Sequence, residues 1–182
     1  MNGQKLLVVS DSHGLRSDLK VILKWAKNQT IDTAIFLGDG VSDIAPAAEA
    51  SEFYRPWVIV RGNNDYEFRI PDTTTLDFGG KRFFLCHGHR LNLRTGFYSL
   101  FNAAQKVQAD AALFGHTHVP IHKNMNGILL INPGSIGLGR SRAGETFATI
   151  ECPQGEPIKI EFWVIDDEEN ISALDISLVP SH

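Results

Sequence analysis

The fold is decided by the stretch LLVVSDSH at residues 6–13, in which an apolar run ends in a polar cluster. Residues 5–10 predict a buried strand, because the run is short, apolar and closed by polar residues. The same arrangement recurs four times: AIFLGD at 34–39, WVIVRGNN at 57–64, RFFLCHGH at 82–89 and AALFGHTH at 111–118. Because sites in α/β sheets form outside the carboxyl ends of the strands, we expect the five polar clusters to converge on one crevice.

The first half of the chain alternates strands with helices. Apolar residues recur at helical spacing from Leu15 to Ala26, with Ser17 or Asp18 as the expected N-cap. A shorter helix is expected to follow Asp43. Strand, helix and strand in this order predict a parallel sheet with right-handed crossovers. The elements expected in this half are 5–10, 15–26, 33–37, 43–50 and 57–60.

The second half predicts two hairpins, one helix and further strands that we expect to be antiparallel. Gly79-Gly80 and Asn126-Gly127 occupy the two hairpin turns, and Asn-Gly is typical of type I′ turns. The tail after about residue 166 is ambiguous, because Ile171, Leu174 and Leu178 fit helical packing or no packing at all. We expect residues 1–182 to form a single domain. The elements expected here are strands 74–78, 81–86, 111–114, 119–123, 128–132, 146–152 and 159–164 and a helix at 96–108.

Composition narrows the class of protein. The chain carries 17 basic and 21 acidic residues, a net charge of −4, and no run of Lys or Arg, so an extended nucleic-acid surface is not expected. No stretch approaches the 18 or so apolar residues of a membrane span. Cys86 and Cys152 lie in strand-like runs and are expected to be buried free thiols, as suits a reducing compartment. We expect a cytoplasmic protein without a membrane partner, and a homo-oligomer is compatible with the sequence.

Each polar cluster has an ordinary explanation when it is taken alone. Asp-Ser-His can be a turn before a helix, Gly-Asp-Gly is common in turns, and paired histidines can be exposed and inert. Five such accidents, all at strand ends and all with ligand chemistry, are less probable than one shared site. The potential metal ligands are Asp11, His13, Asp39, Asn63, His87, His116 and His118, with His89 beside them.

The number of ligands indicates more than one metal ion. Three oxygen donors and four imidazoles exceed what one tetrahedral zinc site needs, and structural zinc is dominated by thiolates, which are not paired here. Two adjacent metals that share a carboxylate would use this set. Such a pair, about 3.5–4 Å apart, clamps the attacking and leaving oxygens of a displacement, typically at phosphorus.

Five motifs in order carry a resemblance to a known family: D-x-H, G-D-x-x-x-D, G-N-x-D, H-G-H and G-H-x-H. Over residues 6–137 the sequence resembles the calcineurin-like metallophosphoesterases. Its short length and its Asn132-Pro133-Gly134-Ser135 segment are similar to their small YfcE-like phosphodiesterase branch. The resemblance implies a four-layer α/β/β/α sandwich of the α/β class, with mixed sheets.

The resemblance also implies how the ligands are shared and what they do. Asp11, His13 and His118 would hold one metal, and Asn63, His87 and His116 the other. Asp39 would bridge both, and a metal-bridging hydroxide would attack phosphorus in line. The family often uses Mn²⁺, although the ligand set would also accept Fe, Ni or Zn. The expected substrate is a small phosphodiester or nucleotide-like molecule.

The sequence departs from the family's pattern at Asn64, where many relatives have a histidine that can protonate the leaving group. An amide cannot act as a general acid near neutral pH, although it can still hydrogen-bond a phosphate oxygen. We therefore predict hydrolysis of activated phosphodiesters and weak activity on alkyl monoesters. His89 is a candidate substitute proton donor and substrate contact, and Asp65 is expected to orient its neighbours.

Several alternatives stay open from sequence alone. The enzyme could be a phosphomonoesterase or a nucleotide pyrophosphatase, or the fold could serve as a scaffold module with weak or lost catalysis, as in a retromer subunit. Asn132 could support the site or simply form an Asn-Pro turn. Tyr66, Phe68 and Phe97 could stack a base, but aromatic residues near a cleft are also common in cores.

Overall fold

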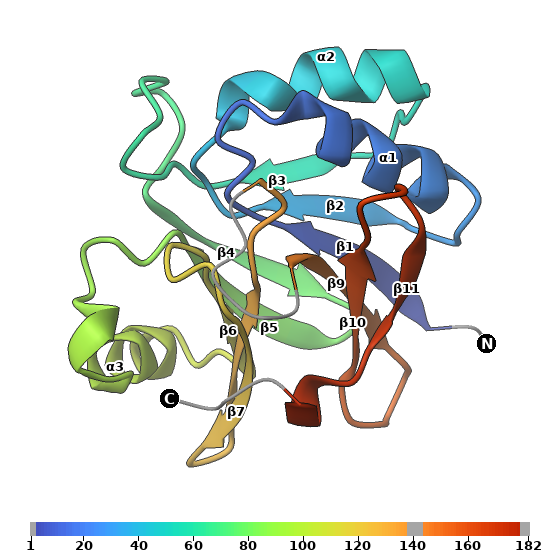
Figure 1. Ribbon diagram of the computed structural model, residues 1–182. Helices are drawn as coiled ribbons and strands as arrows, with labels where there is room; N and C mark the ends of the chain where they lie inside the picture. The colour runs from blue at the N-terminus through green and yellow to red at the C-terminus, as the bar shows by residue number, and fades with distance from the viewer. Residues whose placement is uncertain (1–2, 138–143, 179–182) are drawn as a thin grey trace.

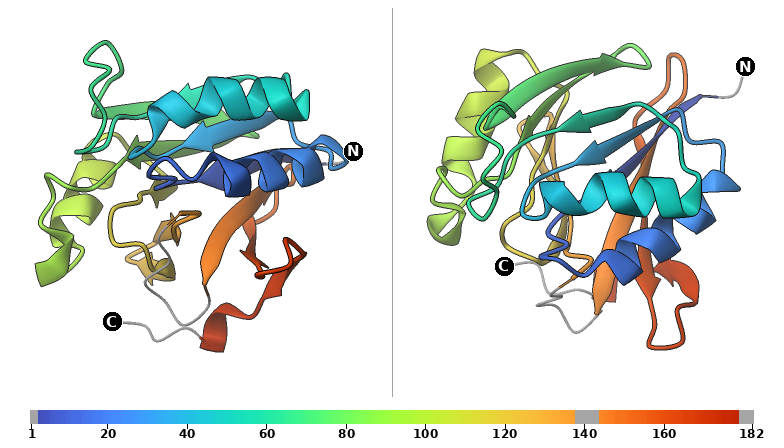
Figure 2. Two further views of the ribbon diagram at one scale, coloured as in Figure 1. Left: turned by 45° about the horizontal axis from the view of Figure 1, so that its top comes forward. Right: turned by 90° about the horizontal axis from the view of Figure 1, so that it is seen from above.

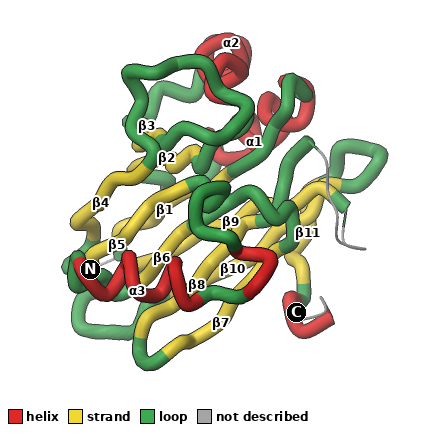
Figure 3. Tube along the Cα trace, turned by 90° about the vertical axis from the view of Figure 1, so that its left-hand side faces the viewer, coloured by secondary structure: helices red, strands yellow, loops and turns green. Residues whose placement is uncertain are grey.

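Two β-sheets face each other, and helices cover their outer faces (Figure 1). The computed structural model describes residues 3–137 and 144–178. Helices α1 (Arg16–Lys27) and α2 (Val41–Ser51) lie side by side over the first sheet, as Figure 2 shows. Helix α3 (Tyr98–Lys106) covers the second sheet, on the opposite side of the molecule (Figure 3). The arrangement is the four-layer α/β/β/α sandwich with mixed sheets that the sequence predicts.

The first sheet has six strands in the order β11-β10-β9-β1-β2-β3. Strands β1, β2 and β3 are parallel, with Val8 opposite Ile35, as expected from the strand–helix alternation. Strand β9 runs antiparallel to both β1 and β10. The bounds are β1 (Gln4–Val9), β2 (Thr33–Phe36), β3 (Trp57–Ile59), β9 (Glu145–Cys152), β10 (Lys159–Ile165) and β11 (Ile171–Leu174).

The second sheet has five strands in the order β4-β5-β6-β8-β7. The expectation that the strands of the second half are antiparallel is wrong for its centre, where β5, β6 and β8 are parallel. Parallel neighbours need a crossover, and α3 provides the one between β5 and β6. The bounds are β4 (Thr73–Phe78), β5 (Lys81–Cys86), β6 (Ala111–Leu113), β7 (Pro120–Met125) and β8 (Ile128–Pro133).

Because successive side chains of a strand point to opposite faces of its sheet, the buried apolar side chains form three layers. On β1, Leu7 and Val9 face α1 and α2, whereas Leu6 and Val8 face the second sheet. On β5, Phe83 and Leu85 point into the layer between the sheets, and Phe84 and Cys86 point toward α3. Each strand of the central region is therefore buried on both faces, which explains the nearly continuous apolar runs in the sequence.

Both expected hairpin turns are present. Gly79 and Gly80 have φ of 57° and 74°, and Asn126 and Gly127 have φ of 49° and 89°. Positive φ at both central residues is what a type I′ turn requires. Residues 125 and 128 pair directly across the second turn.

Two expectations about helices are wrong. Helix α1 begins at Arg16 with Leu15 as its N-cap, so neither Ser17 nor Asp18 is the N-cap. The side chain of Leu15 makes no capping hydrogen bond. The chain after Asp166, whose packing the sequence left open, forms β11 and a short 3₁₀ turn, η2 (Ile176–Leu178). The helix expected at 96–108 is shorter, because a 3₁₀ turn, η1 (Leu93–Thr95), precedes α3. In the described residues no helix is long and apolar enough to cross a membrane.

Candidate metal centre

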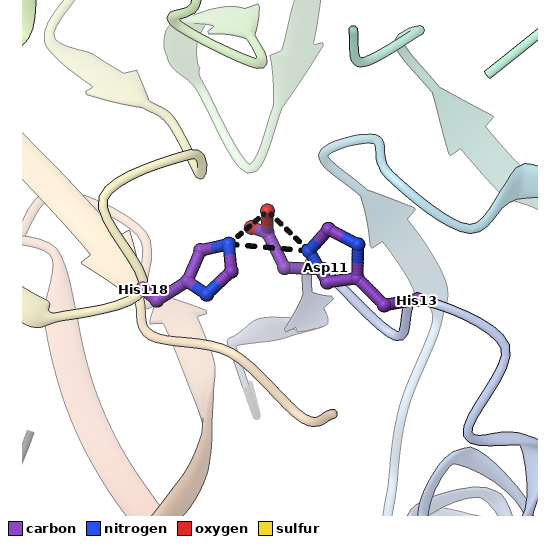
Figure 4. A group of neighbouring side chains, drawn as sticks. All are labelled: Asp11, His13 and His118. Carbon is purple, nitrogen blue, oxygen red and sulfur yellow. Dashed lines mark hydrogen bonds and ion pairs between the residues drawn. The ribbon is translucent and has the colours of Figure 1, made fainter. Parts of the chain in front are cut away.

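The first group of ligands joins β1 to the loop after β6. Oδ1 of Asp11 lies 3.1 Å from Nε2 of His118 and 3.6 Å from Nε2 of His13. The two imidazole nitrogens are 3.2 Å apart. Figure 4 shows the three side chains pointing toward one another. Three donor atoms at this separation can bind one cation in common.

The second group shares Asp11 and adds ligands from β2 and β5. Nε2 of His87 lies 3.4 Å from Oδ2 of Asp39 and 3.9 Å from Oδ1 of Asp11. The ring of His116 packs edge-on against that of His87, with centroids 5.1 Å apart. Asp11 and Asp39 therefore lie at the centre, with four histidines around them.

Two buried atoms at this centre have no hydrogen-bond partner among the described residues: Oδ1 of Asp11 and Nε2 of His87. Leaving a buried polar atom unpaired costs about 1–3 kcal/mol, so such atoms need an explanation. Carboxylate oxygens and imidazole nitrogens are ligands of divalent transition metals. The residues present therefore fit the divalent cations that this set of donors predicts.

The other polar atoms of these ligands are held by the protein. Nδ1 of His87 donates to the carbonyl of Leu37 at 2.7 Å, which leaves Nε2 as the atom that faces the carboxylates. Oδ2 of Asp11 accepts hydrogen bonds from the Ser10 hydroxyl and from the backbone N–H of His116. Asp11 and His87 therefore each direct one defined atom, Oδ1 and Nε2, at the centre.

The ligand loops have an unusual backbone. Ten non-glycine residues in the described part of the chain have positive φ, and five of them are predicted ligands. Positive φ is uncommon outside glycine and clusters at functional sites, where the surrounding structure must hold it. These five are Asp11, His13, Asp39, His116 and His118, with φ between 48° and 67°.

Charge at the centre shifts the pKa values of the ligands. Burial favours the neutral form of Asp11, yet the neighbouring imidazoles of His118 and His13 hold its pKa below the usual range. The nearby Asp11 carboxylate raises the pKa of His13. Burial alone would lower the pKa of His87, but the Asp39 and Asp11 carboxylates raise it. Burial lowers the pKa of His116. The centre is therefore a negative site that favours added positive charge.

Asn63 does not join the cluster as directly as the other predicted ligands. It is exposed, and its side chain makes no hydrogen bond within the described residues. Asn64 contacts Asp39 instead, with its amide Nδ2 2.7 Å from Oδ2 and its backbone N 2.8 Å from Oδ1. The structure thus brings six of the seven predicted ligands together, and Asn63 is exposed.

Asp65 holds the Asp39 loop. Its Oδ2 accepts from the backbone N–H groups of Asp39 and Gly62, each at 2.8 Å. Its Oδ1 accepts from those of Gly40 and Val41, at 2.8 and 2.9 Å. Val41 is the first residue of α2, so the carboxylate also satisfies the start of that helix. Asp65 acts on the centre through Asp39.

His89 lies beside the second group of ligands. Its ring centroid is 5.5 Å from that of His87 and 6.4 Å from that of His116. Its Nδ1 is buried and has no hydrogen-bond partner in the described part of the chain. Burial and the nearby His87 lower its pKa.

Known proteins resemble this chain in sequence. The family described as "Calcineurin-like phosphoesterase superfamily domain" matches residues 5–155. The chain belongs to this superfamily. It is 33% identical over 145 residues to the probable metallophosphoesterase YsnB of Bacillus subtilis, covering 80% of this chain and 82% of that protein. It is 26% identical over 154 residues to the phosphodiesterase YfcE of Escherichia coli, covering 74% and 80%.

Solved structures of calcineurin-like proteins share the fold. A predicted phosphoesterase from Streptococcus pneumoniae superposes with a TM-score of 0.76 at 25% identity, over 96% of this chain and 99% of that one. Vps29 of Entamoeba histolytica, crystallised with zinc, gives 0.77 at 19% identity, over 94% and 97%. At that identity the second comparison shows the fold alone.

One calcineurin-like position was not assigned a role from the sequence. The buried carboxylate of Asp43 accepts from the Ser12 hydroxyl at 2.7 Å, from Gly14 N at 2.9 Å and from Arg16 Nε at 2.9 Å. It therefore ties the loop that carries His13 to α2. Its spacing of four from Asp39 was the available signal.

Asn132 holds the turn that carries His116 and His118. Its buried amide donates to the carbonyl of Gly115 at 2.8 Å and to the hydroxyl of Thr117 at 3.0 Å. Both partners belong to the turn that carries His116 and His118. The amide oxygen also accepts from Gly134 N, so the side chain serves the Asn-Pro turn as well.

Proposed function

We propose that this calcineurin-like protein is a dinuclear metal-dependent phosphodiesterase. The observation that carries the proposal is the pair of unpaired buried atoms, Oδ1 of Asp11 and Nε2 of His87, which face each other across 3.9 Å. The family match and the phosphodiesterase relatives support the reaction class.

The ligands divide into two sets around the central carboxylates. Asp11, His13 and His118 would hold one cation. His87 and His116 would hold the other, with Asn63 completing it and Asp39 shared between the two. Mn²⁺ is our first choice, and Fe, Ni or Zn would also suit these donors. When bound, two such cations lower the pKa of water and neutralise charge on the phosphoryl oxygens.

The chain's own side chains then set the geometry. The bond from His87 Nδ1 to Leu37 keeps one ring nitrogen pointed inward, and Asp65 fixes the loop of Asp39 through four backbone N–H groups. Positioning of this kind is a large part of catalysis, because misplacement by about 1 Å can cost roughly 100-fold in rate.

Asn64 supports a diesterase with activated leaving groups. Its amide is committed to Asp39 and has no proton to give near neutral pH. General acid catalysis contributes roughly 10²–10⁴-fold, so alkyl leaving groups should suffer most. His89 is the nearest other candidate donor. A phosphomonoesterase or nucleotide pyrophosphatase is the alternative, and the ratio of mono- to diester rates on one preparation separates them.

The test compares wild type with Asp39→Asn on bis-p-nitrophenyl phosphate and Mn²⁺. We expect turnover by the wild type and a loss of at least about 100-fold in the variant, because one bridging charge is removed. Asp32→Asn, an exposed carboxylate that bonds only Lys5 N among the described residues, is the matched control. Undiminished turnover by Asp39→Asn would refute the proposed mechanism.

A scaffold role is the second candidate, because the fold is shared with Vps29. It predicts metal-loaded protein without turnover, or protein that takes up no metal. Metal analysis together with the diester assay distinguishes the two functions.

A further inference from the structure

A pocket of about 260 Å³ opens beside the metal centre. It shares His13 and Asp39 with the centre, and Ser42, Tyr66 and Glu67 also line it. A phosphoester bound at the metals would therefore send one of its ester groups into this pocket.

Tyr66 is the aromatic residue that this pocket offers. It is 82% exposed, so its ring is available to a ligand. The other two aromatic candidates are already engaged. The Arg61 guanidinium lies over the ring of Phe68, 5.1 Å from its centroid, and Phe97 packs on Phe114 in the core beneath α3. Tyr66 is therefore the residue on which a base would stack at this site.

The charge on the wall restricts what can enter. No Lys or Arg is found among the described residues that line the pocket, whereas four carboxylates are. Those of Asp43 and Asp65 are occupied by hydrogen bonds from the loops around them. Glu67 remains, and its carboxylate accepts a hydrogen bond from the backbone N–H of Tyr66. The nearby Arg16 guanidinium is bonded to Asp43 and does not line the pocket, so a second phosphate is disfavoured, but hydroxyl groups would find an acceptor.

We propose that this pocket binds the nucleoside of a nucleotide ester, with the base stacked on Tyr66 and the sugar hydroxyls donating to Glu67. The proposal rests on the proposed function, since it needs a phosphoryl group at the metals. It adds the substrate class. This is a phosphodiester in which one of the two groups esterified to the phosphate is a nucleoside that carries no further phosphate.

The test is calorimetric binding of adenosine 5′-monophosphate and ribose 5-phosphate to the Mn²⁺-loaded protein. Stacking of one base on an aromatic ring is worth roughly 5- to 150-fold in affinity. We expect the nucleotide to bind about 10-fold more tightly than the sugar phosphate, and Tyr66→Ala to abolish this difference. Tyr66→Phe should retain it. Tyr54→Ala is the matched control, because Tyr54 is also exposed (77%) but precedes β3, whereas Tyr66 follows it.

A second ligand tests Glu67. Removal of both sugar hydroxyls, in 2′,3′-dideoxyadenosine monophosphate, should weaken binding to the wild type by roughly 10-fold and have little effect on Glu67→Ala. Equal affinity of wild type for nucleotide and sugar phosphate, or equal behaviour of Tyr66→Ala and Tyr54→Ala, would overturn the proposal.

The outcomes separate this proposal from the one it rests on. Tyr66-dependent nucleotide binding without diester hydrolysis would leave the pocket established and refute the catalytic function. Diester hydrolysis without a preference for the nucleotide would refute the pocket alone. Release of adenosine during the titration would identify a monoesterase with the same pocket.

Discussion

Oδ1 of Asp11 lies 3.1 Å from Nε2 of His118, in the interior of the protein, and its partner oxygen is already occupied by Ser10 and His116. A carboxylate that is held on one side and unpaired on the other is a preorganised metal ligand. The protein's own hydrogen bonds therefore orient this ligand.

Asp11→Asn should remove metal uptake while the fold is retained. The amide has nearly the same shape and its oxygen can keep the bonds from Ser10 and His116, but it removes the negative charge that Asp11 contributes to the first set of ligands. We expect at least one metal equivalent to be lost and the far-ultraviolet circular dichroism to be unchanged. Asp77→Asn, an exposed carboxylate paired with Arg82, should take up metal as wild type does. Full metal uptake by Asp11→Asn would contradict the assignment.

Gly115→Ala should displace the Asp11 carboxylate through its other oxygen, Oδ2. A Cβ at this position would lie 2.1 Å from the Ser10 hydroxyl and 2.7 Å from Oδ2 of Asp11, so one of them must move. We expect metal affinity to fall by at least about 10-fold, measured by competition with a chelator. Gly80→Ala introduces strain at positive φ but meets no neighbour, so it should lower stability and leave metal affinity alone.

Asp65→Asn should destabilise the protein by about 3 kcal/mol, because the new NH₂ group would face two backbone N–H donors in place of an acceptor. Urea unfolding measures this loss. Asp166→Asn is the control: its carboxylate also accepts two backbone N–H groups, but in an exposed turn where water can replace it. We expect that variant to be destabilised much less than Asp65→Asn. Equal losses in the two variants would show that burial of Asp65 does not matter.

Metal affinity should rise with pH across neutrality. The pKa values of His13 and His87 are raised in the metal-free protein, by Asp11 for His13 and by Asp39 and Asp11 against burial for His87. Both rings therefore keep their protons above pH 6.5, and a cation must displace them. His13 and His87 belong to different sets of ligands, so each cation displaces one of these protons, and its affinity should rise by up to roughly tenfold per pH unit until the raised pKa is passed. Calorimetry at several pH values measures the slope, and a flat profile between pH 6 and 8 would contradict it.

Asn64→His should raise the hydrolysis rate selectively for diesters with poor leaving groups. An imidazole at this position can supply the proton that an amide cannot, and the backbone N–H of residue 64 would still bond Asp39. We expect the rate on an alkyl p-nitrophenyl diester to change little and that on a dialkyl diester to rise by about 10- to 100-fold. An equal change for both substrates would show that residue 64 does not act as a leaving-group acid.

The sequence predicts the residues of the candidate site more accurately than the first and last residues of the helices and strands. Asp11, Asp39, His87 and His118 follow buried strands, and the rule that parallel strands open their sites at one edge was enough to bring them together. The start of α1 could not be read in this way. The acceptor for Gly14 N and Arg16 Nε is Asp43, which lies on another helix, so no local N-cap is needed.

The tail shows a second limit of local patterns. Ile171 and Leu174 are three residues apart, which puts them on one face of a helix but on opposite faces of a strand. In the structure Ile171 packs under α1 and Leu174 packs between the sheets. The pairing with β10 decides this outcome, and spacing within the tail carries no information about a partner strand.

The most direct test of the central claim is an anomalous difference map from a crystal grown with Mn²⁺. The account predicts two peaks about 3.5–4 Å apart, one within coordination distance of Asp11, His13 and His118 and the other of His87 and His116, with Asp39 between them. A single peak, or two peaks elsewhere on the protein, would contradict it.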